Sequence, residues 1–118
     1  MKTRYREIPV YVTKDGSEIR ELMHPGVHGN ALQSLAEAKI GPGEKTHLHR
    51  HRTSEELYHV TAGAGIMTLG DSRFPIEVGD TVHIPPGIPH CVEAATGGPL
   101  HILCCCSPAY RHEDTEIL

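Results

Sequence analysis

The stretch from Gly43 to His51, Gly-Glu-Lys-Thr-His-Leu-His-Arg-His, places three of the chain's ten histidines at alternate positions. Side chains two positions apart on a β-strand point to the same face, so the imidazoles of His47, His49 and His51 would lie on one side. Neutral imidazole is the commonest metal ligand in proteins, and burying three imidazoles with neither metal nor acceptors costs several kcal/mol. The stretch therefore indicates either a metal-binding strand face or an exposed strand with a hydrated histidine face.

Residues on either side of this run recur at fixed spacings. The first pattern consists of Gly43, His49, His51, Glu56 and Gly63, and the second of Gly79, Pro85, Gly87 and His90. The two patterns, separated by residues 64–78, together resemble the two signature motifs of the cupin superfamily. The separation is the short one typical of small single-domain cupins. One position departs from the family pattern, because Ala94 stands where the second motif usually ends in Asn.

The resemblance implies a cupin-type antiparallel β-barrel with metal ligands at His49, His51, Glu56 and His90. His49 and His51 share one strand face, whereas Glu56 and His90 begin later strands, so these side chains converge only if the sheet curls into a barrel. Three imidazoles and one carboxylate suit a divalent transition metal such as Fe, Mn, Ni, Zn or Cu. A six-coordinate ion would keep two positions for water, substrate or O₂.

Turn residues indicate the same fold class without the family resemblance. The 118 residues include 12 Gly and 9 Pro, and they separate short apolar segments at intervals of about 8–12 residues, which predicts an all-β sandwich or barrel. Residues 31–40 are predicted as a strand, and residues 17–22 as a helical turn or a strand. The dipeptide Gly79-Asp80 between two apolar alternations predicts a hairpin. We expect one domain over residues 1–118, with an N-terminal strand and loop arm (1–30), the barrel (31–106) and a C-terminal tail (107–118).

Three further residues are candidates to line the cavity. His47 is in phase with His49 and His51, and is either an acid–base group or a core histidine. Tyr58 is in phase with Glu56, and either presents its hydroxyl inward or serves packing. Gln33 precedes the first motif on the predicted strand and is a candidate polar lining residue. His59 and His83 are expected away from the metal-facing side.

The cysteines do not form a disulfide pattern. Cys91 stands alone, and Cys104, Cys105 and Cys106 are consecutive, so neighbouring side chains on a strand would point to opposite faces. We expect free thiols, as in a reducing compartment. A thiolate of Cys104 or Cys106 close to the metal is the alternative.

Composition restricts the partners. The net charge of −4 argues against nucleic acid, which requires a basic surface. No apolar run approaches the ~20 residues of a membrane span, and the first residues show no secretory signal, so we expect a cytoplasmic protein with no membrane partner. Open sheet edges favour pairing of two chains, so we expect a homodimer.

The expected function is that of a metal-dependent enzyme acting on a small organic acid, enol or polyol. A dioxygenase ranks first, and a non-redox isomerase, lyase or decarboxylase follows closely. A module that binds a metal and a small ligand without catalysis remains the alternative from a different class.

Overall fold

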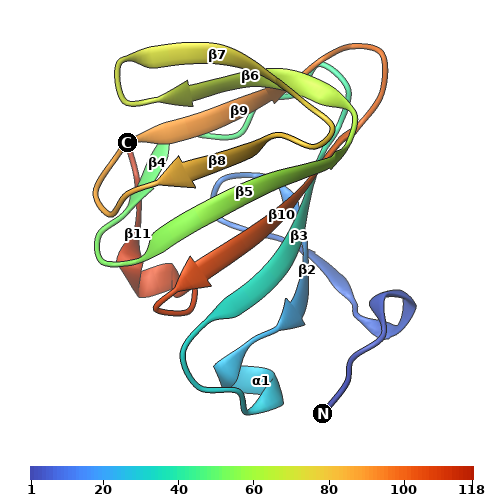
Figure 1. The fold of residues 1–118 in the computed structure, drawn as a ribbon, viewed down its shortest axis with the longest axis vertical. Helices are drawn as coiled ribbons and strands as arrows, with labels where there is room; N and C mark the ends of the chain where they lie inside the picture. Colours follow the sequence, from blue (N-terminus) through green and yellow to red (C-terminus); the bar gives the residue numbers. More distant parts are fainter.

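The computed structural model describes residues 1–118 and consists of two antiparallel β-sheets (Figure 1). The all-β barrel prediction is therefore confirmed. The first sheet has the order β1-β2-β3-β10-β5-β8 and the second the order β11-β4-β9-β6-β7. In the first sheet the strands are β1 (Val10–Val12), β2 (Glu18–Met23), β3 (Ser34–Ile40), β10 (Leu100–Ser107), β5 (Glu55–Ala62) and β8 (Thr81–Ile84). In the second they are β11 (Thr115–Ile117), β4 (His49–His51), β9 (His90–Ala94), β6 (Ala64–Leu69) and β7 (Ser72–Glu77).

Helical structure is confined to three short turns: η1 (Tyr5–Glu7), α1 (Pro25–His28) and η2 (His112–Asp114). No helix has both the length and the apolar character needed to cross a membrane. Residues 17–22, for which the sequence left a helical turn or a strand open, lie mostly in β2, and residues 34–40 form β3 as predicted.

The N-terminal segment contributes β1 and β2 to the first sheet, and the C-terminal segment contributes β11 to the second. β2 pairs with β3 along its length, and β11 pairs with β4 through Thr115 opposite His51 and Ile117 opposite His49. In Figure 1 the N-terminus lies at the lower end of the molecule and the C-terminus beside β4 and β9. The last residues of the chain are thus built into the sheet that carries the histidine run.

The hairpin predicted at Gly79-Asp80 is wrong. β7 pairs with β6 in one sheet, whereas β8 pairs with β5 in the other, so the turn carries the chain between sheets. Turn residues indicate where the chain reverses direction, but they do not determine which strand the next segment pairs with.

The core lies between the sheets and follows the alternation of each strand. In β5 the buried side chains are Glu56, Tyr58 and Val60, and in β10 every second side chain from Leu100 to Cys106 is buried. Met67 and Leu100 are completely buried at its centre. The same alternation directs the side chains of His49 and His51 of β4 inward. The histidine site and the hydrophobic core therefore both lie between the two sheets.

Candidate metal centre

Three histidines converge between the sheets. His49 and His51 come from β4, and His90 begins β9, directly opposite His49 in the strand pairing. Their side chains are 3%, 4% and 0% exposed, and one ring nitrogen from each lies within 4.8 Å of the others. These three residues, named here the histidine triad, are the ones that the motif spacing predicts to meet.

Hydrogen bonds at Nδ1 fix the orientation of each ring. Nδ1–H of His49 donates to the carbonyl oxygen of His47 at 2.8 Å, and Nδ1–H of His90 donates to that of Ile88 at 2.9 Å. Nδ1 of His51 lies 3.0 Å from Oγ1 of Thr115. The Thr115 hydroxyl is itself engaged as a donor, because it bonds a backbone carbonyl at 3.0 Å, so it accepts from His51. All three Nε2 atoms are left to face the site.

The Nε2 atom of His90 is buried and has no hydrogen-bond partner. Burial, together with the neighbouring His90, lowers the pKa of His49 to about 4, so His49 is neutral at pH 7 and can offer a lone pair. Buried lone pairs that converge without a donor are unfavourable unless a cation lies between them. The triad therefore fits a divalent metal ion.

Glu56, at the start of β5, lies beside two members of the triad. Its Oε1 is 3.1 Å from Nε2 of His51 and 3.6 Å from Nε2 of His90. Burial opposes ionisation of Glu56, but the close approach of the His51 and His90 imidazoles outweighs it and lowers the pKa to about 2. An ionised carboxylate in this place supplies the negative charge and the oxygen ligand that a divalent ion would need.

The second oxygen of Glu56 is held by a thiol. Sγ of Cys106 donates to Oε2 at 3.0 Å, which leaves Oε1 facing the histidines. Burial raises the pKa values of Cys104 and Cys106, so both are neutral thiols in the cavity wall. All four cysteines are free, as expected. Neither the Cys104 nor the Cys106 sulfur belongs to the group of possible ligand atoms that lie within 4.8 Å of one another.

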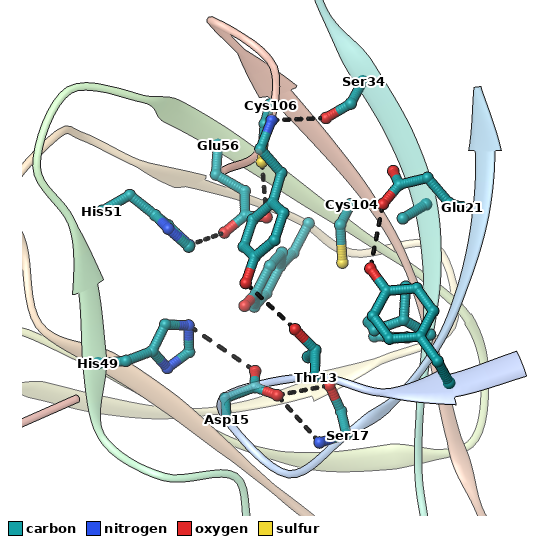
Figure 2. Close-up of a pocket in the computed structure, with 16 residues that line it drawn as sticks. Thr13, Asp15, Ser17, Glu21, Ser34, His49, His51, Glu56, Cys104 and Cys106 are labelled. Carbon is teal, nitrogen blue, oxygen red and sulfur yellow. Dashed lines mark hydrogen bonds and ion pairs between the residues drawn. The ribbon is translucent and has the colours of Figure 1, made fainter. Parts of the chain in front are cut away.

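A small cavity of about 50 Å³ opens beside His49 and His51 (Figure 2). Sixteen residues from both sheets and both terminal segments line it. The lining includes three of the chain's four tyrosines. It also includes two glutamates and two cysteines whose side chains face inward from strands. The tyrosines are Tyr11, Tyr58 and Tyr110, and the four other residues are Glu21, Glu56, Cys104 and Cys106.

Asp15 is one of several cavity residues that were not predicted from the sequence. Its Oδ1 accepts hydrogen bonds from the backbone N–H of Ser17 at 2.9 Å and from the Ser17 hydroxyl at 2.6 Å. Its Oδ2 lies 3.7 Å from Nε2 of His49, as Figure 2 shows. The sequence identified residues 14–17 only as a turn, and no local signal shows that this turn packs against β4.

Tyr110 brings the C-terminal segment into the site. Its backbone N–H donates to Oγ of Ser34 at 2.9 Å, and its hydroxyl lies 3.1 Å from Oγ1 of Thr13. Its ring meets that of His51 edge-on, with centroids 5.7 Å apart. The sequence left open whether residues 110–114 are an exposed end or close the barrel, and the structure makes Tyr110 part of the cavity wall.

The three lining candidates have different outcomes. Tyr58 lines the cavity, with its ring 5.9 Å from that of His90. His47 is exposed and outside the cavity because β4 begins only at His49, so the alternation does not extend back to it. Gln33 is also exposed and outside the cavity, since Ser34 and not Gln33 is the inward-facing residue where β3 begins. His59 and His83 are exposed, as expected.

The architecture defines the class of protein: a double-sheet antiparallel barrel with a buried histidine triad that could hold a metal ion. The model of the cupin domain family matches residues 36–106, and the chain belongs to this family.

The chain is also similar to curated relatives and to solved structures. The chain is 53% identical over 118 residues to the protein MJ1618 of Methanocaldococcus jannaschii, covering all of this chain and 94% of that protein. It is 35% identical over 75 residues to protein SchB of Streptomyces halstedii, covering 64% of this chain and 54% of SchB. A predicted oxalate decarboxylase from Thermotoga maritima superposes with a TM-score of 0.78 at 25% identity, over 92% of this chain and 99% of that chain. The polyketide cyclase RemF from Streptomyces resistomycificus shares the fold, with a TM-score of 0.80 at 19% identity over 97% of this chain and 88% of that chain.

We expect the substitution Thr115→Val to weaken metal binding about 10- to 100-fold. The change removes the acceptor that holds Nδ1–H of His51 and leaves the size of the side chain nearly unchanged. Metal affinity is measured by competition with a chromogenic chelator. Thr115→Ser, which keeps the hydroxyl, serves as the control and should bind metal like the wild type. Equal affinity for all three proteins would show that Thr115 does not orient His51.

Asp114 fixes the turn that separates His51 from Glu56. Its carboxylate accepts from the backbone N–H groups of Thr53 and Ser54 and from the Thr53 hydroxyl at 2.7 Å. Burial opposes its ionisation, but the hydrogen bonds from Thr53 and Ser54 prevail and hold its pKa below the ordinary 3.8. The stabilisation is therefore complete above about pH 4 and is lost as the pH falls through the folded-state pKa.

We expect Asp114→Asn to lower the free energy of unfolding at pH 7 by about 1–3 kcal/mol, because a neutral amide satisfies these donors less well. The wild-type advantage should shrink as the pH falls below about 4. Urea unfolding at several pH values measures both effects. A difference that stays constant down to the acid limit would contradict the role given to the ionised carboxylate.

Proposed function

We propose that the chain is a metal-dependent enzyme that acts on a small organic acid, enol or polyol by proton transfer, as an isomerase, lyase or decarboxylase. The observation that carries the proposal is the free oxygen of Asp15, 3.7 Å from Nε2 of His49 at the edge of the cavity. Bound to the histidine triad and Glu56, a divalent metal would act as a Lewis acid that polarises a substrate oxygen.

Asp15 is built to receive a proton. Because Ser17 holds Oδ1 with two hydrogen bonds, the carboxylate cannot turn freely and Oδ2 remains directed toward His49. Oδ2 would take a proton from the carbon next to the polarised carbonyl, and the electron pair would move to the carbonyl oxygen. Return of the proton to a neighbouring carbon gives an isomerase, and loss of a leaving group from that carbon gives a lyase. In a decarboxylase the C–C bond to the departing CO₂ would break, and a protonated Oδ2 would deliver its proton to the carbon that keeps the electron pair.

The surrounding wall supports chemistry of this kind. Tyr110 and Thr13 share a hydrogen bond at the cavity surface, so either hydroxyl can hold the oxygen of a bound substrate. The likeness at 25% identity to a predicted oxalate decarboxylase, which spans nearly the whole of both chains, also favours a small carboxylate as substrate.

A dioxygenase is the second candidate. The histidine triad and Glu56 would also hold a redox-active ion, which would supply the chemistry that activates O₂. This reaction would need O₂ as co-reactant and a redox-active ion such as iron or manganese.

The experiment that decides between these classes measures turnover with and without oxygen. Protein purified anaerobically and loaded in turn with Mn(II), Zn(II) and Fe(II) is incubated with hydroxy acids, keto acids, enols and polyols in deuterated water. The proposal predicts product formation and deuterium incorporation without oxygen uptake. Product formation that consumes oxygen in proportion would establish the dioxygenase instead, and tight ligand binding with no turnover on any metal would establish a binding module.

The Asp15→Asn variant tests the proposed proton acceptor. We expect turnover to fall by about 10²–10⁴-fold while the bound metal is retained. Asp80→Asn, on the turn between β7 and β8, is the control and should keep full activity. Unchanged turnover in Asp15→Asn would contradict the assignment.

We also propose that the protein forms a homodimer. β1 lies at the edge of its sheet, and Val10 and Val12 on it are 44% and 69% exposed. An exposed apolar edge strand favours pairing with a second copy. Light scattering coupled to size-exclusion chromatography measures the mass directly, and a single-chain mass at micromolar concentration would contradict the dimer.

A further inference from the structure

Glu21 of β2 stands out among the acidic residues of the cavity. Its Oε2 accepts one hydrogen bond, from the Tyr11 hydroxyl at 3.2 Å, and its Oε1 is buried with no partner. Figure 2 shows Glu21 on the opposite side of the cavity from His49 and His51. The cavity therefore has two polar ends, the proposed metal centre and this carboxylate.

Comparison with the other inward-facing carboxylates shows how unusual this arrangement is. Glu56 has His51 on one oxygen and Cys106 on the other, and Asp15 has two donors from Ser17 on Oδ1, while its Oδ2 faces His49 from a partly exposed side chain. Only Glu21 leaves a buried carboxylate oxygen unpaired. Because burying an acceptor without a donor is unfavourable, the fold loses stability at this position.

The chain supplies no hydrogen-bond donor to Oε1 of Glu21, although nearby histidines favour the ionised form of the carboxyl group. Ile19, Ala36 and Ala38 make the neighbouring part of the cavity wall apolar. Burial raises the pKa of Glu21 despite the opposing charge of His24. A carboxylate maintained at a cost to stability in the wall of a ligand cavity is explained if a ligand supplies the missing donor.

We propose that Glu21 is the second recognition point of the cavity, and that the substrate carries a hydroxyl or protonated amine at the end away from the metal. This inference rests on the proposed function, since it takes the other end of the substrate to bind the metal through an oxygen. Compact hydroxy acids, amino acids and polyols have this chemistry. Binding would require the Glu21 carboxylate to turn so that Oε1, which is buried in the structure, reaches the incoming donor.

The test measures the binding of matched acids to the Zn(II)-loaded protein by isothermal titration calorimetry. Glycolate, 3-hydroxypropanoate and 4-hydroxybutanoate are compared with acetate, propanoate and butanoate, and glycine, β-alanine and 4-aminobutanoate replace hydroxyl by ammonium. We expect at least one donor-bearing acid to bind about tenfold more tightly than its unsubstituted partner. The hydroxyl and ammonium series show which donor the site selects.

In Glu21→Gln and Glu21→Leu this preference should fall to less than about twofold, while the affinity for the unsubstituted acids stays unchanged. Glu18→Gln, on the exposed face of the same strand, is the control and should keep the preference. Glu21→Leu should also raise the melting temperature of the free protein, because it removes the unpaired carboxylate. A purely structural carboxylate would give the opposite change in melting temperature.

The outcomes separate this inference from the function on which it rests. Suppose that the unsubstituted acids bind the loaded protein and no donor-bearing acid binds more tightly. Glu21 then does not recognise the substrate, but the proposed binding of an acid to the metal is still supported. A preference that persists in Glu21→Leu also overturns the inference. If none of the acids binds the loaded protein, the proposed function fails and this inference fails with it.

Discussion

Addition of a divalent transition metal should raise the melting temperature of the wild-type protein by on the order of 10 °C, and His90→Ala should abolish the rise. A ligand that binds only the folded state at about 1,000 times its dissociation constant adds about 4 kcal/mol of stability, and in a domain of this size each kcal/mol shifts the midpoint by several degrees. His90 is the most informative position because its Nε2 is buried without any partner.

Differential scanning calorimetry with Zn(II), Co(II) and Ni(II), each followed by excess chelator, measures this effect. His83→Ala, which removes an exposed imidazole on β8, is the matched control and should keep the full response. An equal rise in wild type and His90→Ala would place the stabilising metal outside the triad. A melting temperature that chelator leaves unchanged, in protein shown to hold metal beforehand, would contradict a site built into the barrel.

Gly63→Ala should be the most destabilising single glycine substitution in the barrel, with a loss of about 3 kcal/mol or more. Gly63 joins β5 to β6 with φ of +77°, where an alanine is strained. A Cβ atom there would also lie 2.3 Å from the carbonyl oxygen of Pro99, in the segment leading into β10. Because the obstacle is backbone at the start of the central strand of its sheet, it cannot move without disturbing the core around Leu100.

Gly79→Ala provides the comparison that isolates the clash. Gly79 also has a positive φ, +94°, but an added Cβ would meet no atom within 4 Å. Its substitution should therefore cost only the backbone strain, about 1–2 kcal/mol. Urea unfolding with linear extrapolation gives both values. Equal losses in the two variants would show that the close approach to Pro99 is relieved by relaxation.

The part of the site that follows from strand alternation was predictable from the sequence. His49 and His51 lie two positions apart on β4, and Glu56 and Tyr58 lie two apart on β5, so their shared inward faces are local properties of the chain. The meeting of β4 with β9 is not local, and it followed from the resemblance of the two motifs to a known family. Local periodicity and a known pattern together predicted the triad.

Contacts made by the chain ends were not predictable in the same way. Asp15, Thr115 and Tyr110 reach the site because the N-terminal turn packs against β4, and because β11 returns from the far end of the sequence to pair with it. Nothing in a short window around these residues reports such a partner. His47 was wrongly predicted to face the site, because the alternation of β4 was extended to a residue that lies before the strand begins.

The central claim is that His49, His51 and His90 hold one metal ion in the barrel. Metal content by inductively coupled plasma mass spectrometry, after loading and dialysis, tests it most directly. The wild type and the control His59→Ala/His83→Ala should each retain one ion per chain, while His49→Ala/His51→Ala, with an unchanged circular dichroism spectrum, should retain close to none. Equal metal in all three proteins, or none in the loaded wild type, would contradict the claim.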